Sequence, residues 1–306
     1  MQRRFSDYAV ISLKGIAMGA ADAVPGVSGG TIAFISGIYE ELIATISGVN
    51  LSLFATLKKE GIKSFWSQLN GNFLTALLSG ILVSYVSFMR LAKYLIEHQP
   101  VLIWSFFFGL IVASVYFVGK QITKWNAAAI IAFAIGAFAA YYISQLPSMA
   151  TNDNPYFLFF AGALAICAMI LPGISGSFIL VILGAYKTLS DALHDFDLKK
   201  VAIFAIGALV GILSFSHVLK WLFKHYHNVT MAILTGFIFG SLNKIWPWKE
   251  VLTWTTNSEG VQIPLVEKSI SPYGYEGDPQ LVFAIALMIV GFFVIFILEK
   301  LGDKKD

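Results

Sequence analysis

Pro25-Gly26-Val27-Ser28-Gly29-Gly30-Thr31-Ile32 is repeated later in the chain as Pro172-Gly173-Ile174-Ser175-Gly176-Ser177-Phe178-Ile179. The second copy lies 147 residues after the first, and Gly37-x-Tyr39 recurs as Gly184-x-Tyr186 at the same shift. Each copy places a helix-breaking Pro-Gly pair and several small residues inside apolar surroundings. Paired interrupted helices of this kind are typical of the binding sites of membrane transporters. The repeat therefore predicts that function lies at the two breaks.

The composition of the chain indicates an integral membrane protein. Of its 306 residues, 57% are hydrophobic and only 13% are charged, and the mean hydropathy is +0.74. The apolar runs are too long for core helices of a soluble domain. The net charge of +3 is too small and too dispersed for nucleic-acid binding. We therefore expect membrane lipids, and no nucleic acid, among the partners of this chain.

The sequence offers no motif for catalysis or for a metal site. The single cysteine, Cys167, excludes an internal disulfide and a cysteine metal cluster. The histidines are scattered, without a helical pair at metal-ligand spacing. A nucleophile elbow, a Walker loop and a dinucleotide-binding fingerprint are missing in any usable setting. We therefore predict a protein that is not an enzyme and has no catalytic residues, no cofactor and no metal.

The apolar segments predict an all-α integral membrane protein built from two halves. Segment 8–48 would be about 60 Å long as one straight helix, against roughly 30 Å for a hydrocarbon core, so it must fold back near Pro25. We expect each half to contain a broken helical hairpin, either re-entrant or fully spanning, and three transmembrane helices. In residues 1–150 the predicted segments are the hairpin 8–48 and the spans 73–96, 101–119 and 127–146. In residues 151–306 they are the hairpin 156–193, the spans 201–223, 230–246 and 281–298, and an outer loop 247–279.

The order of these segments predicts an inverted repeat. Residues 80–93 pair with 207–220 at a shift of 127, so the likeness between the halves extends beyond the Pro-Gly motif. A broken hairpin with three spans crosses the bilayer an odd number of times, which turns the second half upside down. The Lys and Arg residues of the loops favour cytoplasmic N- and C-termini, and 147–155 carries neither residue type. The oligomeric state stays open, with a homo-oligomer as one alternative.

The two breaks are candidate anion sites. After each Pro-Gly pair, the first amides of the next half-helix lack intrahelical acceptors, and the helix dipole favours a negative charge there. At membrane depth such donors need a partner, which is water, protein or ligand. A purely structural alternative is a tight turn with close helix packing. The candidate phosphate-binding residues are Gly26, Ser28, Gly29, Gly30 and Thr31 in the first half, and Gly173, Ser175, Gly176 and Ser177 in the second.

Basic residues within the spans extend this candidate site. Arg90 and Lys93 are three residues apart and share one helix face, and Lys220 takes the place of Lys93 in the second half. A cation near each membrane face suits a phosphate head group that is approached from either leaflet. The alternative is that these side chains only snorkel from the span ends.

Acidic residues near the first break are candidates for ion coupling. Asp22 lies three residues before Pro25, and its counterpart in the second half is Met169. A carboxylate inside an apolar stretch suits proton or cation coupling, although a cap or turn former at the break is the alternative. Glu40 and Glu41 follow the Gly37-x-Tyr39 motif and are either further coupling groups or residues of a solvated face.

A long motif around the first break resembles a known family. Residues 19–34 read Gly-Ala-Ala-Asp-Ala-Val-Pro-Gly-Val-Ser-Gly-Gly-Thr-Ile-Ala-Phe and are followed by Gly-Ile-Tyr-Glu-Glu-Leu at 37–42. This run, with Leu-Pro-Gly-Ile-Ser-Gly-Ser at 171–177, closely resembles the bacterial polyprenyl-phosphate (undecaprenyl-phosphate) transporter family, formerly known only as a domain of unknown function. The likeness extends over nearly the whole chain.

The resemblance implies a flippase in the bacterial cytoplasmic (inner) membrane. Such a protein returns undecaprenyl phosphate from the outer to the cytoplasmic leaflet, so that the lipid carrier is reused for peptidoglycan and other cell-envelope polymers. The residues by themselves indicate only an anion-handling transporter with an inverted repeat, for which we expect alternating access. A channel or carrier for a small inorganic anion is the main alternative, and a lipid-phosphate phosphatase is a second one.

Overall fold

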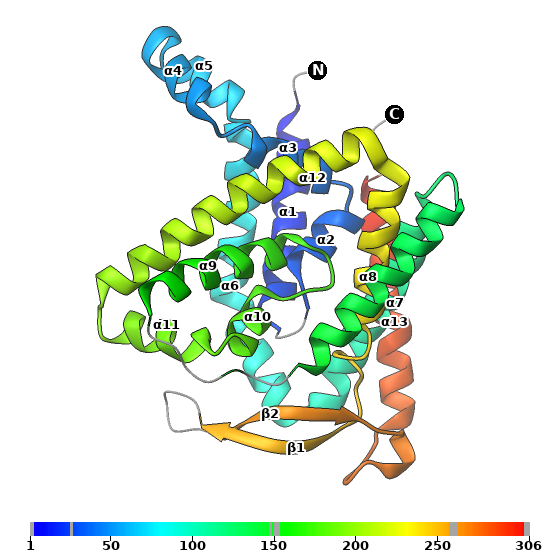
Figure 1. The fold of residues 1–306 in the computed structure, drawn as a ribbon. Coiled ribbons are helices and arrows are strands. Elements are labelled where there is room, and N and C mark those ends of the chain that lie inside the picture. The colour runs from blue at the N-terminus through cyan, green and yellow to red at the C-terminus, as the bar shows by residue number, and fades with distance from the viewer. Residues whose placement is uncertain (1–2, 25–26, 147–148, 150–153, 257–261, 303–306) are drawn as a thin grey trace.

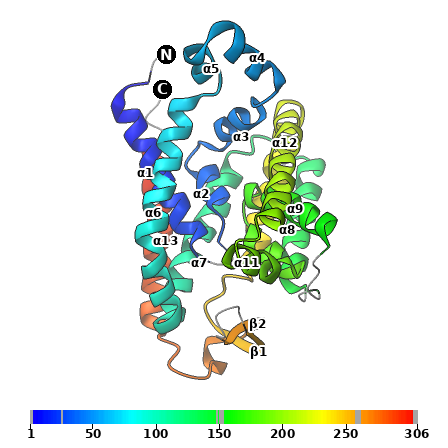
Figure 2. The same cartoon turned by 90° about the vertical axis from the view of Figure 1, so that its left-hand side faces the viewer.

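The computed structural model describes residues 3–24, 27–146, 149, 154–256 and 262–302. Most of the described chain is helical, and the helices form one body with a small β-hairpin at one end (Figure 1). The N- and C-terminal ends both lie at the opposite end of this body (Figures 1 and 2). The body therefore has a terminal end and a hairpin end.

The first half of the chain contains two short helices at the broken segment and three long helices after it. The three long helices occupy nearly the same residues as the predicted spans 73–96, 101–119 and 127–146. The helices are α1 (Phe5–Asp22), α2 (Gly29–Ile35), α3 (Tyr39–Ser47), α4 (Leu51–Glu60), α5 (Ile62–Gln68), α6 (Gly71–His98), α7 (Pro100–Lys120) and α8 (Ala127–Gln145). The pair α4 and α5, which lies between the predicted segments 8–48 and 73–96, extends from the terminal end (Figure 1).

The second half has a similar order of helices, with a β-hairpin inserted before its last helix. Its elements are α9 (Pro155–Ile170), α10 (Gly176–Ile182), α11 (Ala185–His194), α12 (Leu198–Ser241), β1 (Lys249–Thr256), β2 (Gln262–Ser269), the short 3-10 helix η1 (Pro272–Gly274) and α13 (Leu281–Gly302). The 44 residues of α12 include non-helical backbone at Tyr226, so two helical arms meet there. These arms correspond to the predicted spans 201–223 and 230–246, although the second arm ends at Ser241 rather than at 246.

Several helices are long and apolar enough to cross a membrane. Among the described residues these are α6, α7, α8 and α12, and the bent pair α10 and α11 raises their number from four to five. Helix α9 is apolar but shorter, and so is the apolar stretch Leu281–Ile297 of α13. The chain is therefore a mostly helical membrane protein, as its composition predicts.

The predicted outer loop 247–279 contains ordered β-structure. Strands β1 and β2 pair antiparallel, with Glu250 opposite Lys268 and Trp254 opposite Pro264. Strand β1 contains one valine, three threonines and one tryptophan, and β2 contains one isoleucine and one valine, all residue types that favour extended backbone. The predicted all-α fold is therefore incomplete, because this loop outside the apolar spans contains residues that favour β-strands.

Glycines bring helices into close contact in the same pattern in both halves. A Cβ on Gly15 would overlap the carbonyl oxygen of Leu77, and a Cβ on Gly162 would overlap that of Phe204. The two pairs are related by the shifts of 147 and 127 residues that relate the sequence repeats. Helix α1 thus packs on α6 as α9 packs on the first arm of α12. A second matched pair of contacts joins Gly80 to Ser12 and Gly207 to Phe159.

The last helix of each half packs against the other half. Gly109 of α7 lies against the backbone of Met288 in α13, and Gly236 of α12 lies against that of Phe133 in α8. Positions 109 and 236 are again 127 residues apart. The two halves are therefore interlocked, and the two breaks come to lie between them.

Candidate functional site

The two repeated motifs meet in the interior of the protein. The backbone amide of Gly173 donates a hydrogen bond to Thr31 Oγ1 at 2.9 Å, and Ser28 Oγ lies 3.4 Å from the carbonyl oxygens of Met169 and Leu171. A Cβ on Gly30 would overlap the carbonyl oxygens of residues 169 and 170, so only glycine permits this approach. The two breaks therefore form a single junction.

The first break is closed by its own side chains. Asp22 Oδ1, at the end of α1, accepts a hydrogen bond of 2.6 Å from the amide of Gly29, the first residue of α2. The amide of Thr31 donates to the carbonyl of Ser28 at 2.9 Å, and all seven residues of α2 are buried. We expected the amides at the breaks to be available to a ligand. Three of them instead donate to protein acceptors, namely those of Gly29, Thr31 and Gly173. Gly26 lies outside the described residues.

A buried lysine holds the other end of α2. Lys14 of α1 is only 8% exposed, and its Nζ donates a hydrogen bond of 2.6 Å to the carbonyl oxygen of Ser36, which follows the last residue of α2. A positive group at a helix C-terminus and a negative group at its N-terminus both interact favourably with the helix dipole. Helix α1 therefore binds α2 at both ends, through Lys14 and Asp22.

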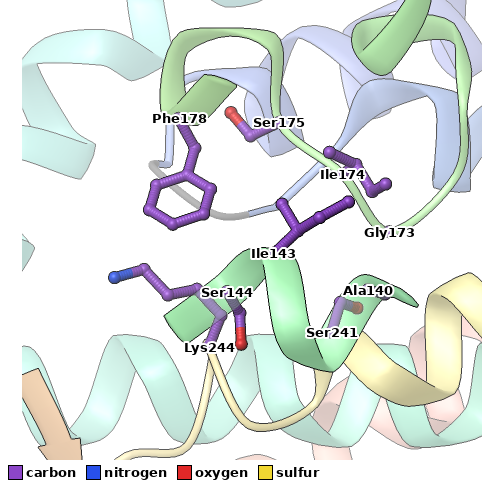
Figure 3. A pocket seen from close by; sticks show the side chains of 9 residues that line it. All are labelled: Ala140, Ile143, Ser144, Gly173, Ile174, Ser175, Phe178, Ser241 and Lys244. Atoms are coloured by element: carbon purple, nitrogen blue, oxygen red, sulfur yellow. The ribbon is translucent and has the colours of Figure 1, made fainter. Parts of the chain in front are cut away.

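The second break is open on one side. A small, partly open cavity lies beside residues 173–175, between α10, the end of α8 and the segment after α12 (Figure 3). The hydroxyl groups of Ser175 and Ser177 are 2.9 Å apart, and Ser177 is exposed. The cavity is lined by Ala140, Ile143, Ser144, Gly173, Ile174, Ser175, Phe178, Ser241 and Lys244.

A charged cluster borders this cavity at the hairpin end. Lys244 Nζ lies 3.2 Å from Glu267 Oε2 and 4.9 Å from the centre of the Phe178 ring. Lys249 Nζ lies 3.5 Å from the same Glu267 oxygen and 4.1 Å from the centre of the Trp104 ring. The carboxylate of Glu267 thus forms an ion pair with both lysines.

Burial and mutual charge shift the ionisation of this cluster. Burial, together with the nearby charge of Lys244, lowers the pKa of Lys249 to about 8, although Glu267 acts in the opposite direction. Burial alone would raise the pKa of Glu267, but the two lysines outweigh it and hold that pKa below its usual value. Glu267 is therefore a carboxylate at neutral pH.

The predicted basic residues of the spans lie apart from the junction. Arg90 of α6 and Lys220 of α12 are both exposed, and among the described residues neither has a hydrogen-bond or ion-pair partner. The side chain of Lys93 lies outside the described part of the chain. Exposed cations on the outer faces of long helices agree with the snorkelling alternative as well as with contact to a head group.

Glu40 and Glu41 make contacts at the terminal end. Glu41 binds Arg3 through two hydrogen bonds of 2.5 and 2.6 Å and also accepts one of 2.9 Å from Asn70. Glu40 lies 3.2 Å from His227, next to the bend of α12. Both glutamates therefore connect elements of the terminal end, and a coupling role for them stays a prediction.

Two lysines of the site were not singled out from the sequence. Lys14 and Lys244 both fall inside segments that we assigned to the membrane, 8–48 and 230–246. A charged residue in such a segment is a functional candidate by default, and this signal was sufficient to find both. The partnership of Lys244 with Glu267 had no comparable signal, because it depends on how the β-hairpin folds back.

Comparison with known proteins identifies the family. Residues 18–263 match the model of the undecaprenyl phosphate translocase-like family. A polyprenyl-phosphate transporter of Vibrio cholerae serotype O1 is 43% identical over 308 aligned positions, which cover 99% of this chain and 100% of that protein. The chain belongs to the undecaprenyl phosphate translocase-like family.

A second relative extends this comparison. A polyprenyl-phosphate transporter of Staphylococcus aureus is 32% identical over 256 positions, which cover 77% of this chain and 85% of that protein. No solved structure matches the chain. The family and both relatives are named for transport and not for catalysis, so this member is a transporter and not an enzyme.

Proposed function

We propose that this protein moves undecaprenyl phosphate from the outer to the cytoplasmic leaflet of the bacterial inner membrane, so that the lipid carrier is reused in cell-envelope synthesis. The names of the two relatives support polyprenyl phosphate as the cargo. The direct contact between the two motifs, Gly173 amide to Thr31 hydroxyl at 2.9 Å, is the observation that carries the proposal for this chain. It supports one shared site rather than two separate turns.

Movement of the cargo is proposed to follow alternating access between two inverted repeats. The matched glycine contacts at shifts of 147 and 127 residues support two halves of equivalent packing. The position of both chain ends at one end of the body, opposite the β-hairpin, agrees with cytoplasmic termini (Figure 2). The broken hairpins then enter from opposite faces and meet near the middle of the bilayer.

The phosphate is the part of the cargo that needs the protein. Burial of a phosphate without compensation is prohibitive in a medium of low dielectric constant, whereas the polyprenyl tail remains in lipid throughout. Hydroxyl groups of Ser175 and Ser177 and amides of the motifs offer donors, and charge-assisted hydrogen bonds from a lysine strengthen such binding. The open cavity at the second break is where we place the head group in this conformation.

Transport by the purified full-length protein in vesicles tests the proposal. Vesicles that carry undecaprenyl phosphate only in the outer leaflet are prepared with and without protein, and the phosphate accessible from outside is followed over time. Loss of outer-leaflet phosphate only in the presence of protein is the expected result. Chloride or inorganic phosphate flux without any movement of the lipid would instead support the small-anion channel or carrier.

A further inference from the structure

The cluster beside the second break carries a surplus positive charge. Lys244 and Lys249 share Glu267, and the charged groups that act on Lys249 and on Glu267 are the other members of the same cluster. The side chains of Lys244, Lys249 and Glu267 are 24%, 8% and 21% exposed. Partial burial weakens the solvation of this net charge, and an additional anion would offset it. The arrangement therefore favours an additional anion.

The partly open cavity brings further polar side chains to this cluster. Lys244 and three serines, Ser144, Ser175 and Ser241, line it, and Figure 3 shows Lys244 and Phe178 on facing sides of it. The ammonium group of Lys244 supplies donors, and a phosphate has several acceptor oxygens to receive them. The hydroxyl groups of Ser144 and Ser241 donate to carbonyl oxygens of their own helices, at 2.6 and 2.8 Å, and have to rotate to bind a ligand.

We propose that Lys244, with Ser144, Ser175 and Ser241, receives the phosphate monoester of the cargo at the hairpin end, and that Glu267 occupies Lys244 until the phosphate displaces it. The proposal rests on the function proposed above and adds the residues of the entry site. Displacement leaves Glu267 paired with Lys249, which lies 3.5 Å away, so the carboxylate keeps a partner in both states. Glu267 is therefore a competitor for the head group as well as a support for the β-hairpin.

A phosphate monoester fits the cluster better than a monovalent anion. Its charge at pH 7 is about −1.5 to −2, which exceeds the charge of the carboxylate it replaces. Lysine binds phosphate as a point charge and tolerates different orientations of the head group. The lipid head group and free inorganic phosphate share this chemistry, so the experiment has to separate them.

Equilibrium binding to the full-length protein in detergent tests the entry site. Farnesyl phosphate is the probe, and inorganic phosphate and farnesol are measured in parallel. Lys244→Gln should weaken farnesyl phosphate binding about tenfold, since one charge-assisted hydrogen bond is lost. Glu267→Gln should tighten it about threefold, because the competing carboxylate is gone while the amide still contacts the lysines. A residue with only a structural role would not improve binding when it is replaced.

Matched controls come from the outer surface of the same hairpin. Lys268 and Glu250 face each other across the strands, and Lys268→Gln and Glu250→Gln should leave binding unchanged. If Glu267→Gln does not fold, Ser144→Ala with Ser241→Ala replaces it and should weaken binding about fivefold. Size-exclusion profiles check the fold of every variant.

The outcomes separate this inference from the proposed function. Wild-type binding of farnesyl phosphate with unchanged affinity in both Lys244→Gln and Glu267→Gln overturns the entry site and leaves the transport function standing. No binding of farnesyl phosphate and no lipid movement in vesicles contradicts both. Equal affinity for inorganic phosphate and farnesyl phosphate, both weakened by Lys244→Gln, overturns the lipid head group as the ligand.

Discussion

The two broken hairpins share a fold but differ in how their short helices are held. In the first, α1 binds both ends of α2, through Asp22 at Gly29 and through Lys14 at Ser36. In the second, the positions of these two charges are occupied by Met169 and Ala161, and α10 begins at an open cavity. Both short helices have seven residues, so length does not explain the difference.

This difference between the hairpins indicates that the two copies of the Pro-Gly motif have different roles. The first hairpin has its polar groups satisfied from within, and its residues Ser28 and Thr31 are 2% and 0% exposed. The second keeps hydroxyl groups and a lysine at a cavity wall. We interpret the first hairpin as the fixed side of the junction and the second as the side that meets the cargo in this conformation.

Removal of the carboxylate at the first break should have the largest effect. Asp22→Ala leaves the buried amide of Gly29 without an acceptor and should cost about 2 kcal/mol of unfolding free energy. Thermal unfolding of the purified protein in detergent measures it. Asp22→Asn retains an acceptor oxygen and should keep most of the stability, and Met169→Ala should cost less than Asp22→Ala. Equal losses at positions 22 and 169 would contradict the contrast between the hairpins.

The contact between the hairpins should give the next largest effect. Thr31→Val keeps the shape of the side chain but removes the acceptor for the amide of Gly173, which should cost about 1.5 kcal/mol. Thr235→Val is the matched control, because the Thr235 hydroxyl bonds only a carbonyl of its own helix. The control should cost about 0.5 kcal/mol. A Thr31→Val protein as stable as wild type would mean that the junction does not hold the halves together.

The serines of the two motifs should differ in binding. Ser175→Ala should weaken farnesyl phosphate binding about fivefold, the equivalent of about 1 kcal/mol, because Ser175 lines the cavity. Ser28→Ala should leave the affinity unchanged, since its hydroxyl packs against carbonyl groups of the other motif. Titrations of both variants under identical conditions decide between them. The reverse result would assign the cargo to the first hairpin.

The sequence predicted the elements whose causes are local. The Pro-Gly pairs and the length of the apolar runs placed the breaks and the long helices, because a helix longer than the bilayer has to fold back. The segments 73–96 and 101–119 coincide with α6 and α7, and the bend of α12 at Tyr226 falls between 201–223 and 230–246. The repeat also indicated which positions are equivalent.

The features that the sequence did not predict depend on long-range packing. The cap of Gly29 by Asp22 was only one of two alternatives, since the geometry of the turn decides it. Lys244 and Glu267 are 23 positions apart and meet only because the β-hairpin folds back. No apolar pattern in the sequence predicts this hairpin. The outward direction of Arg90 depends on which face of α6 packs against α1.

The smallest effect concerns pH and should appear only at the second hairpin. Because the pKa of Lys249 is lowered to about 8, raising the pH from 7 to 9 removes its charge, and Glu267 then pairs with Lys244 alone. Farnesyl phosphate binding should therefore weaken about threefold over this range, as the cluster loses its surplus charge.

Stability should change in the opposite direction over a neighbouring range. The pKa of Lys249 in the folded protein lies below its ordinary value of 10.5, so between pH 8 and 10.5 the unfolded chain binds more protons than the folded one. The free energy of unfolding then rises with pH in that window. Lys249→Met should remove both trends, whereas Lys268→Gln should preserve them. Binding that strengthens as the pH rises would show that the surplus charge of the cluster does not attract the head group.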